Sequence, residues 1–244
     1  MNALYLFSGA QRKSSVTSVL QDLCRNKGLR CKLHDVDIQN SPDWDLTKGA
    51  VQQALLDRIK KGEFDVVLVT PPCSTWSRVR GANCRGPPAI RSKDYPWGFP
   101  WLSSRHQKDA ELGNILIVFM LEVLETLGDH PVAASGRAII IFGEHPEDLG
   151  VIRREEDGMI MEPASIWQLH RMRVLLFERA ALNLSVAGGH HTASLLVSSQ
   201  TFRHCGNGVL ANGQSSMLIA TTWGPFSSAP VSYTHLTLPT KLEV

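Results

Sequence analysis

A cysteine preceded by two prolines is the residue whose setting most clearly suggests chemistry. Cys73 lies in the segment Thr70-Pro-Pro-Cys-Ser-Thr-Trp-Ser77, directly after an apolar run. The two prolines restrict the backbone and hold the cysteine in place. A thiolate here can act as a nucleophile if a helix N-terminus, or the nearby Arg78 and Arg80, lowers the pKa of the thiol. The alternative is a buried structural cysteine. A phosphatase loop of the form Cys-x5-Arg is excluded, because position 79 is Val79.

Small or acidic residues follow the other apolar runs of the chain. They are Ser8 and Gly9 after 4–7, Asp35 and Asp37 at the end of 30–36, and Glu144 after 138–142. A carboxylate after the second strand of a nucleotide-binding fold can accept both hydroxyl protons of a ribose. The alternative is that these residues only make tight turns.

The apolar runs alternate with segments of helical periodicity, and this alternation predicts how the polar residues are positioned. We expect strands at 4–7, 30–36, 64–69 and 138–142, helices near 16–26, 51–61 and 108–127, and a further helix at 163–180. Such alternation predicts an α/β fold with a Rossmann-like, doubly wound, mostly parallel sheet. Ligands bind at the carboxyl ends of such strands, which is where Gly9, Asp37, Cys73 and Glu144 fall.

Three motifs together resemble the C-5 cytosine-specific DNA methyltransferases. Leu6-Phe7-Ser8-Gly9 is similar to the opening of that family's cofactor motif. Pro71-Pro72-Cys73, followed by Ser77, resembles its catalytic Pro-Pro-Cys-x-x-x-Ser loop, and Phe142-Gly143-Glu144-His145 falls where the family has Glu-Asn-Val. The order and spacing agree across residues 4 to 147.

The resemblance implies an S-adenosylmethionine-dependent methyltransferase fold and a mechanism. The Cys73 thiolate attacks C6 of a flipped-out cytosine in DNA, Glu144 assists protonation of N3, and a methyl group is transferred to C5. The residues that the resemblance implies for the cofactor are Phe7, Ser8, Gly9 and Pro71, with Asp35 or Asp37 at the ribose and Asp45 near the adenine.

The sequence also departs from the family. Gln11 stands near the position of the second motif glycine, His145 replaces the asparagine, and the Gln-x-Arg-x-Arg motif and target-recognition domain are not found. The alternative is therefore a catalytically inactive, nucleic-acid-binding relative. An amino-methyltransferase fits less well, because Thr70 and Cys73 occupy its two diagnostic positions.

The long segment after Cys73 is strongly basic. Residues 78–108 contain seven basic residues against one acid, a net charge of +6, with interleaved aromatic residues. This mixture predicts a nucleic-acid contact, with DNA as the expected partner and single-stranded DNA or RNA left open. The predicted contact residues are Arg78, Arg80, Arg85, Arg91 and Lys93. The alternative is that the aromatic residues pack the loop against the sheet.

Length and composition limit the classes of protein to consider. With 244 residues, 43% of them hydrophobic, the chain can form one full-sized core. No apolar run is long enough to span a bilayer, and no membrane partner is expected. The five cysteines include no Cys-x-x-Cys pair, and His190 and His191 have no paired ligand motif nearby, so no metal site is predicted. We expect a reducing, intracellular compartment, either nuclear or cytoplasmic.

Residues 181–244 differ in composition from the rest of the chain. Only Arg203, Lys241 and Glu243 are charged there, against 20% of the whole chain, and residues 231–240 resemble translated adapter or vector sequence. We therefore predict a methyltransferase-like catalytic domain at 1–180 and a low-charge, disordered or non-native tail at 181–244. The alternative is a small β subdomain, which short apolar runs such as 193–197 permit.

Overall fold

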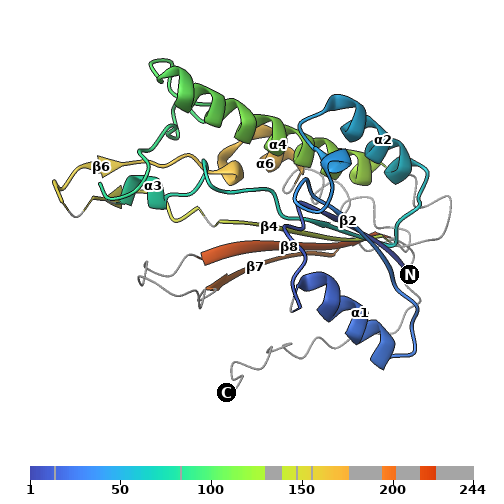
Figure 1. Cartoon of the computed structure of the whole chain (residues 1–244). Coiled ribbons are helices and arrows are strands. Elements are labelled where there is room, and N and C mark those ends of the chain that lie inside the picture. Colours follow the sequence, from blue (N-terminus) through green and yellow to red (C-terminus); the bar gives the residue numbers. More distant parts are fainter. Residues whose placement is uncertain are drawn as a thin grey trace.

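A six-stranded sheet forms the centre of the computed structural model (Figure 1). The structure describes residues 1–13, 15–82, 84–129, 139–146, 148–154 and 156–175, and the backbone of 194–201 and 215–223. The strand order is β2-β1-β3-β4-β8-β7. The strands are β1 (Asn2–Leu6), β2 (Lys32–Val36), β3 (Val66–Val69), β4 (Ile139–Pro146), β7 (Ser194–Thr201) and β8 (Ser215–Trp223).

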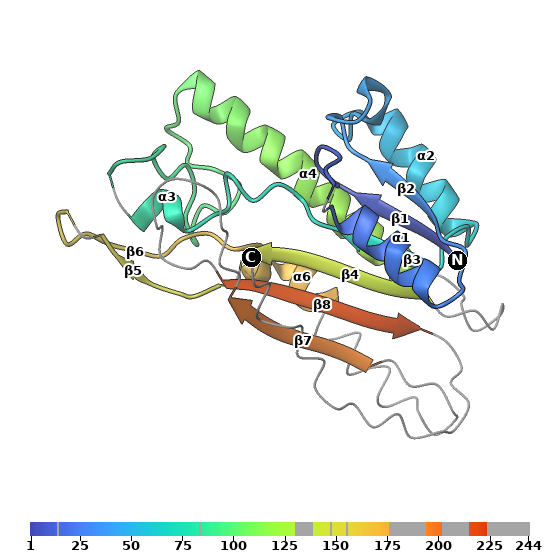
Figure 2. The same cartoon turned by 60° about the horizontal axis from the view of Figure 1, so that its bottom comes forward.

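The first four strands in the order are parallel, as the alternation of strands and helices predicts. Strand β8 lies antiparallel between β4 and β7 (Figure 2). The sheet is therefore mostly parallel, and the prediction of an α/β fold is confirmed at that level.

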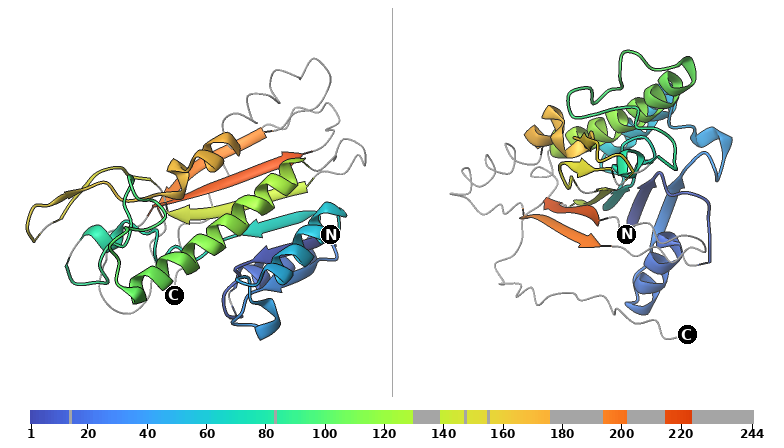
Figure 3. Two further views of the ribbon diagram at one scale, coloured as in Figure 1. Left: turned by 90° about the horizontal axis from the view of Figure 1, so that it is seen from above. Right: turned by 90° about the vertical axis from the view of Figure 1, so that its left-hand side faces the viewer.

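Helices cover both faces of the sheet, as a doubly wound arrangement requires (Figure 1). Helix α1 (Val16–Asn26) lies on one face, and α2 (Gly49–Lys60) and α4 (Ser104–Asp129) lie on the other. Helix α4 crosses the sheet with α2 packed beside it (Figure 3). Helix α1 begins where the Ser15 hydroxyl accepts a hydrogen bond from the Ser18 backbone N–H at 3.2 Å.

The hydrophobic core is concentrated between the sheet and α4. Leu4 and Leu6 of β1, Val67 and Val69 of β3 and Ile141 of β4 face it, which matches the two-residue period of a strand. The opposite face is thinner. Helix α1 buries Cys24, whereas Val16, Val19 and Leu23 remain about half exposed. The helical spacing of the apolar residues in 16–26 thus predicted the helix but not its degree of burial.

Strand β4 is longer than the predicted strand at 138–142. It continues through Gly143, Glu144, His145 and Pro146, which we had expected to form a turn. Backbone pairing with β8 explains the extension, since Glu144 is opposite Leu218 and His145 is opposite Met217. Glu144 is therefore a strand residue.

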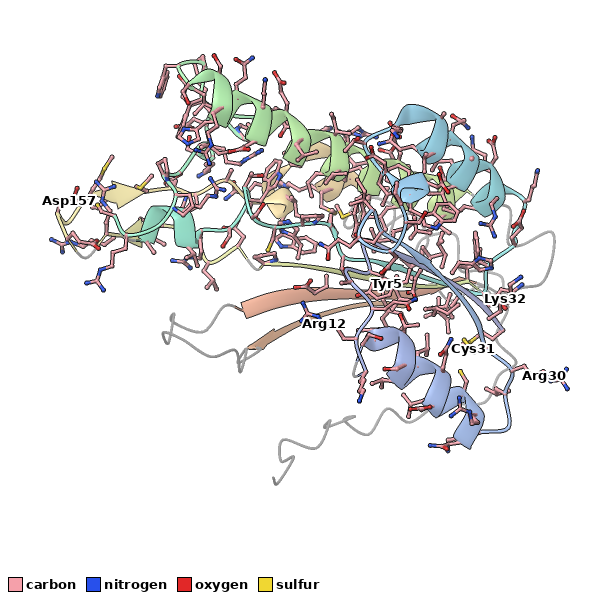
Figure 4. The ribbon with its side chains drawn as sticks, in the orientation of Figure 1. Tyr5, Arg12, Arg30, Cys31, Lys32 and Asp157 are labelled. Atoms are coloured by element: carbon pink, nitrogen blue, oxygen red, sulfur yellow. The ribbon has the colours of Figure 1, made fainter. Side chains whose placement is uncertain are left out.

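The segments after β3 and after β4 contain short elements. They are α3 (Val79–Ala82), a hairpin of β5 (Ile152–Arg153) and β6 (Ile160–Met161), η2 (Ile166–Gln168) and α6 (His170–Arg173); η1 (Pro42–Trp44) follows β2. The predicted helix at 163–180 is wrong at its start, because a Ser165–Gln168 capping box begins η2 there instead. Asp157 lies in the turn of the hairpin, far from the sheet (Figure 4).

Two parts of the predicted tail are strands β7 and β8. The rest of residues 181–244 lies outside the described residues, so the division of the chain at residue 181 stays a prediction. Among the described helices, none combines the length and the apolar character that a membrane crossing needs.

Candidate functional site

The sheet register brings the predicted site residues to one edge. Leu6 of β1 is level with Val36 of β2 and Val69 of β3, and Val69 is level with Gly143 of β4. The residues that follow in each strand therefore meet at the carboxyl edge of the sheet, where ligands bind in such folds. Glu144 is one of these residues.

Phe7 turns the chain at the end of β1. Its φ of 62° lies in the left-handed region, which is unusual for a bulky residue. Its ring is buried edge-on against Phe119 at 6.3 Å, and its backbone donates to Val36 O and accepts from the Thr70 hydroxyl. Such strain persists only where surrounding contacts hold it, and it tends to occur at functional sites.

The turn after Phe7 is bonded to the loop after β2. The Gly9 backbone N–H donates to Asp37 Oδ2 at 2.9 Å, and the Gln39 N–H donates to Asp37 Oδ1 at 2.8 Å. The Asn40 amide donates to the Ser8 hydroxyl and to Gly9 O. Asp37 therefore shapes this turn, as the alternative of a turn residue proposed.

Asp35 and Asp45 also bond to nearby groups of the chain. The Thr17 hydroxyl donates to Asp35 at 2.7 Å and the Gln11 amide donates to it at 3.3 Å. Asp45 accepts from the hydroxyl and backbone N–H of Thr47, and these hydrogen bonds hold the pKa of Asp45 below its ordinary value. Asp45 lies on the loop that leads to α2.

Gly9 lies in an uncovered part of the turn. A Cβ added at Gly9 would meet no atom within 4 Å, so the space in front of this glycine is open. Asp37 accepts one hydrogen bond on each oxygen, and a carboxylate has about four acceptor positions in all. Asp35 likewise accepts one hydrogen bond on each oxygen, from Thr17 and Gln11, so acceptor positions remain on both carboxylates.

Cys73 and Glu144 lie close enough to interact electrostatically. Burial raises the pKa of the Cys73 thiol, and the negative charge of Glu144 raises it further. The condition stated from the sequence, a pKa lowered by a helix N-terminus or by Arg78 and Arg80, is not met among these causes. In this arrangement Cys73 is a thiol at neutral pH, and a reacting group must favour its ionisation.

The loop around Cys73 is held by its own backbone. Pro71 is buried, Thr70 donates to Phe7 O at 3.1 Å, and the Trp76 N–H donates to Cys73 O at 2.9 Å. Arg80 Nε donates to Ser74 O, and Arg80 Nη1 donates to Pro88 O at 3.3 Å. Arg80 therefore connects the parts of the loop that contain Ser74 and Pro88.

Arg91, which we had predicted as a nucleic-acid contact, is 3% exposed. Its guanidinium donates to Pro96 O, Asn114 Oδ1, the Thr75 hydroxyl and Ala110 O, and lies 4.0 Å above the Trp76 ring. Burial lowers the pKa of Arg91 to about 10, and the charge of Arg80 lowers it as well. That prediction is corrected: Arg91 anchors the loop from inside and cannot reach a phosphate in this arrangement.

The remaining predicted contacts are partly or fully accessible. Arg85 is 87% exposed at its side chain, 3.9 Å from Glu156. Lys93 pairs with Glu162 at 2.9 Å, and this hydrogen bond raises the pKa of Lys93. Arg78 is half-buried beside Trp76, where it lines a small hollow open to solvent.

His145 was noted in the sequence only as a departure from a motif, and its burial was not predicted. It is 1% exposed, and neither ring nitrogen makes a hydrogen bond of good geometry, although the Pro146 backbone lies close enough to affect its charge. Burial lowers the pKa of His145 to about 3; the Pro146 backbone opposes this shift, and the charge of Arg91 adds to it. Trp76 Nε1 and Arg91 Nε are also buried without partners. Alternation along β4 would have placed His145 on the α4 face, had the strand been predicted to continue.

Cys24 and Cys31 are neighbours beside the start of β2. Cys31 directly precedes β2, at the amino end of that strand and beside α1 (Figure 4). Burial raises the pKa of Cys31, and the neighbouring Cys24 raises it further. Cys84 is exposed on the long loop, and Cys205 lies outside the described residues.

No group of three or more metal-ligating side chains occurs among the described residues. His190 and His191 lie outside them. Comparison of the chain with protein-family models, with curated proteins and with solved structures finds no match.

Proposed function

We propose that the protein methylates C5 of cytosine in DNA through a covalent intermediate on Cys73, with S-adenosylmethionine as the methyl donor. The observation that carries the proposal is the juxtaposition of Cys73 and Glu144 at the carboxyl ends of adjacent parallel strands. A nucleophile and a carboxylate that assists proton transfer must meet in this way to act on one base. The motif order described in the sequence supports the same assignment.

The chain's own residues perform the covalent step. The Cys73 thiol proton passes to water, and the sulfur forms a bond to C6 of the cytosine. The C5–C6 π bond opens as its electrons move into the ring, and Glu144 assists protonation at N3. Because the pKa of Cys73 is raised by burial and by Glu144, a bound base that draws the Glu144 charge toward N3 also favours the thiolate. After C5 has been methylated, loss of the C5 proton releases the sulfur.

The cofactor's place is proposed at the turn after β1. Gly9 and Asp37 would hold it, with Ser8 and Phe7 shaping the turn and Pro71 beside it. When bound, S-adenosylmethionine would supply the methyl group. The mostly parallel sheet, with helices on both faces, is compatible with a Rossmann-like methyltransferase of this kind.

A mechanism-based trap tests the covalent step. The protein is incubated with S-adenosylmethionine and DNA containing 5-fluorocytosine, whose fluorine cannot leave as a proton does. A denaturation-resistant complex is expected, and its cross-linked peptide should contain Cys73. Cys73→Ser should abolish the complex, because a serine hydroxyl is far less ionised than a thiol.

The matched control is Cys84→Ser. Cys84 is exposed on the same loop but lies outside the Pro-Pro-Cys segment, so its replacement should leave trapping unchanged. If the protein binds cofactor and DNA and yet forms no adduct, the enzymatic proposal fails.

One contact favours a second candidate, a catalytically inactive relative that binds nucleic acid. The Gln11 side-chain amide donates a hydrogen bond to Asp35, near the position at which the family has its second motif glycine. We infer that this side chain leaves less space for the cofactor than the resemblance implies. Calorimetric titration with S-adenosylmethionine and with its demethylated product separates the two candidates. Binding of either compound supports the enzyme, and its absence supports the inactive relative.

A further inference from the structure

Three aromatic rings of the long loop pack against one another on the surface. Phe99 and Trp101 are stacked, with ring centroids 5.2 Å apart and an angle of 9° between their planes. Tyr95 meets both rings edge-on, at 6.0 Å from Phe99 and 5.4 Å from Trp101. We call Tyr95, Phe99 and Trp101 the aromatic platform.

The platform presents ring surface to solvent. Trp101 is 68% exposed and Tyr95 is 43% exposed. Apolar rings of this size are ordinarily covered, and exposed clusters of them mark binding surfaces.

Buried polar contacts hold the loop that carries the platform. Arg91 donates to Pro96 O and to Asn114 Oδ1, and the Asn114 amide donates to Trp97 O at 2.7 Å. The Phe99 N–H donates to Ile90 O at 3.0 Å. The rings are therefore pre-positioned, so that a ligand does not have to order them on binding.

The platform belongs to the same loop as the candidate nucleophile. Trp97 meets Trp76 edge-on at 5.8 Å, and the Trp76 backbone bonds to Cys73. The loop and the β5–β6 hairpin extend from the same end of the sheet (Figure 1, Figure 2).

Positive charge accompanies the rings. Arg105 and Lys108 follow the rings in the sequence, ahead of the acidic Asp109 and Glu111, and Lys93, which precedes the rings, is paired with Glu162. Arg105 and Lys108 are exposed in the first turns of α4, only a few residues after Trp101. Stacking rings beside exposed cations suit a polyanion with accessible base faces.

We propose that the aromatic platform stacks on unpaired bases, so that the preferred partner is single-stranded nucleic acid or an unpaired region of a duplex. The inference rests on the nucleic-acid partner of the proposed function and names its form. In a duplex the base faces are already stacked on one another, and flat rings such as Trp101 can reach them only where the stack is open. A purely apolar protein partner would not need the accompanying cations.

Binding of fluorescently labelled single strands and of duplexes of the same sequence tests this inference, with anisotropy as the readout. The protein should bind the single strand more tightly. Trp101→Ala should weaken single-strand binding about 5- to 150-fold, the range expected for loss of one base–aromatic stack. Trp101→Phe should retain most of the affinity. The salt dependence should be unchanged in Trp101→Ala and flatter in Arg105→Ala, because only the second removes a phosphate contact.

Ile160→Ala is the matched control. Ile160 is also 68% exposed and lies on the β5–β6 hairpin, but it has no ring to stack on a base. Equal losses in Trp101→Ala and Ile160→Ala would mean a general apolar contact and would overturn the inference. So would tighter binding of the duplex. Measuring binding in the Cys73→Ser variant separates the two proposals. Loss of the covalent step should leave base stacking intact, and loss of base stacking in Trp101→Ala should leave Cys73 able to react.

Discussion

The two halves of the carboxyl edge of the sheet differ in how completely their polar groups are hydrogen-bonded. In the β1–β2 half (Ser8, Gly9, Asp35 and Asp37), the carboxylates accept hydrogen bonds from nearby groups of the chain. In the β3–β4 half (Cys73, Trp76, Arg91, Glu144 and His145), four buried nitrogen atoms have no partner. Leaving a buried polar group unpaired costs about 1–3 kcal/mol.

That difference indicates where function resides. A cluster of unpaired buried groups weakens the fold and tends to occur at functional sites. Arg91 connects Trp76, three residues after Cys73, with His145, the residue after Glu144 in β4. The β3–β4 half is therefore the better place to test chemistry.

The largest expected effect concerns Glu144. Glu144→Gln should slow trapping of 5-fluorocytosine by about 10²- to 10⁴-fold, the usual contribution of general acid–base catalysis. The same substitution removes a negative charge that raises the pKa of Cys73, so the resting thiol should react faster with iodoacetamide. A lower pKa raises the thiolate fraction, so the alkylation rate measured at pH 8 should increase.

The opposite signs of these two effects make the test specific. A carboxylate that only supports the structure would also lower stability when replaced, so the free energy of unfolding of Glu144→Gln, measured in urea, should stay close to that of the wild type. Glu111→Gln, an exposed carboxylate on α4, should change neither rate.

Arg91 should have the next largest effect, on stability. Arg91→Ala removes hydrogen bonds to four acceptors and the contact with Trp76. The acceptors, in the loop and in α4, then lack this donor. We expect a loss of about 3 kcal/mol or more in the free energy of unfolding by urea. Arg85→Ala, at an 87% exposed side chain, should cost less than about 0.5 kcal/mol. If Arg91→Ala were as stable as Arg85→Ala, its assignment as an internal anchor would be wrong.

His145 should make stability depend on pH. Its folded-state pKa is lowered from 6.5 to about 3 by burial, so only the unfolded chain takes up a proton as the pH falls below 6.5. Stability from this residue is fully present above pH 6.5 and is lost toward pH 3. The loss should reach about 2 kcal/mol at pH 5, at 1.36 kcal/mol per unit.

His145→Asn should remove this dependence, because an amide does not titrate. Urea unfolding of both proteins from pH 5 to 7.5 measures the difference. A wild-type protein whose stability changes with pH in the same way as that of His145→Asn would show that His145 has an unrecognised polar partner.

Local patterns in the sequence predicted the parallel strands and the residues at their ends. Strand β4 was predicted too short, because Gly143 and Pro146 look like turn residues and the strand that pairs with them, β8, lies some 70 residues later in the chain. Arg91 was predicted to be exposed because charge favours the surface; its burial depends on Asn114 and Trp76, which only the fold brings to it. Pairing and burial of this kind are tertiary effects that local patterns do not contain.

The smallest expected effect tests whether the Gln11 side chain alone restricts binding of S-adenosylmethionine in the β1–β2 half. Gln11 bonds to Asp35 at 3.3 Å on an exposed turn, so Gln11→Ala should change stability by less than about 0.5 kcal/mol. If Gln11 is what narrows the cofactor place, its removal should raise the affinity for S-adenosylmethionine about fivefold, the value of one hydrogen bond of about 1 kcal/mol. Calorimetric titration of both proteins measures this change, with Gln53→Ala on exposed α2 as the matched control. Absence of binding in both proteins would mean that the backbone of the turn closes this half, and would favour the inactive, nucleic-acid-binding relative.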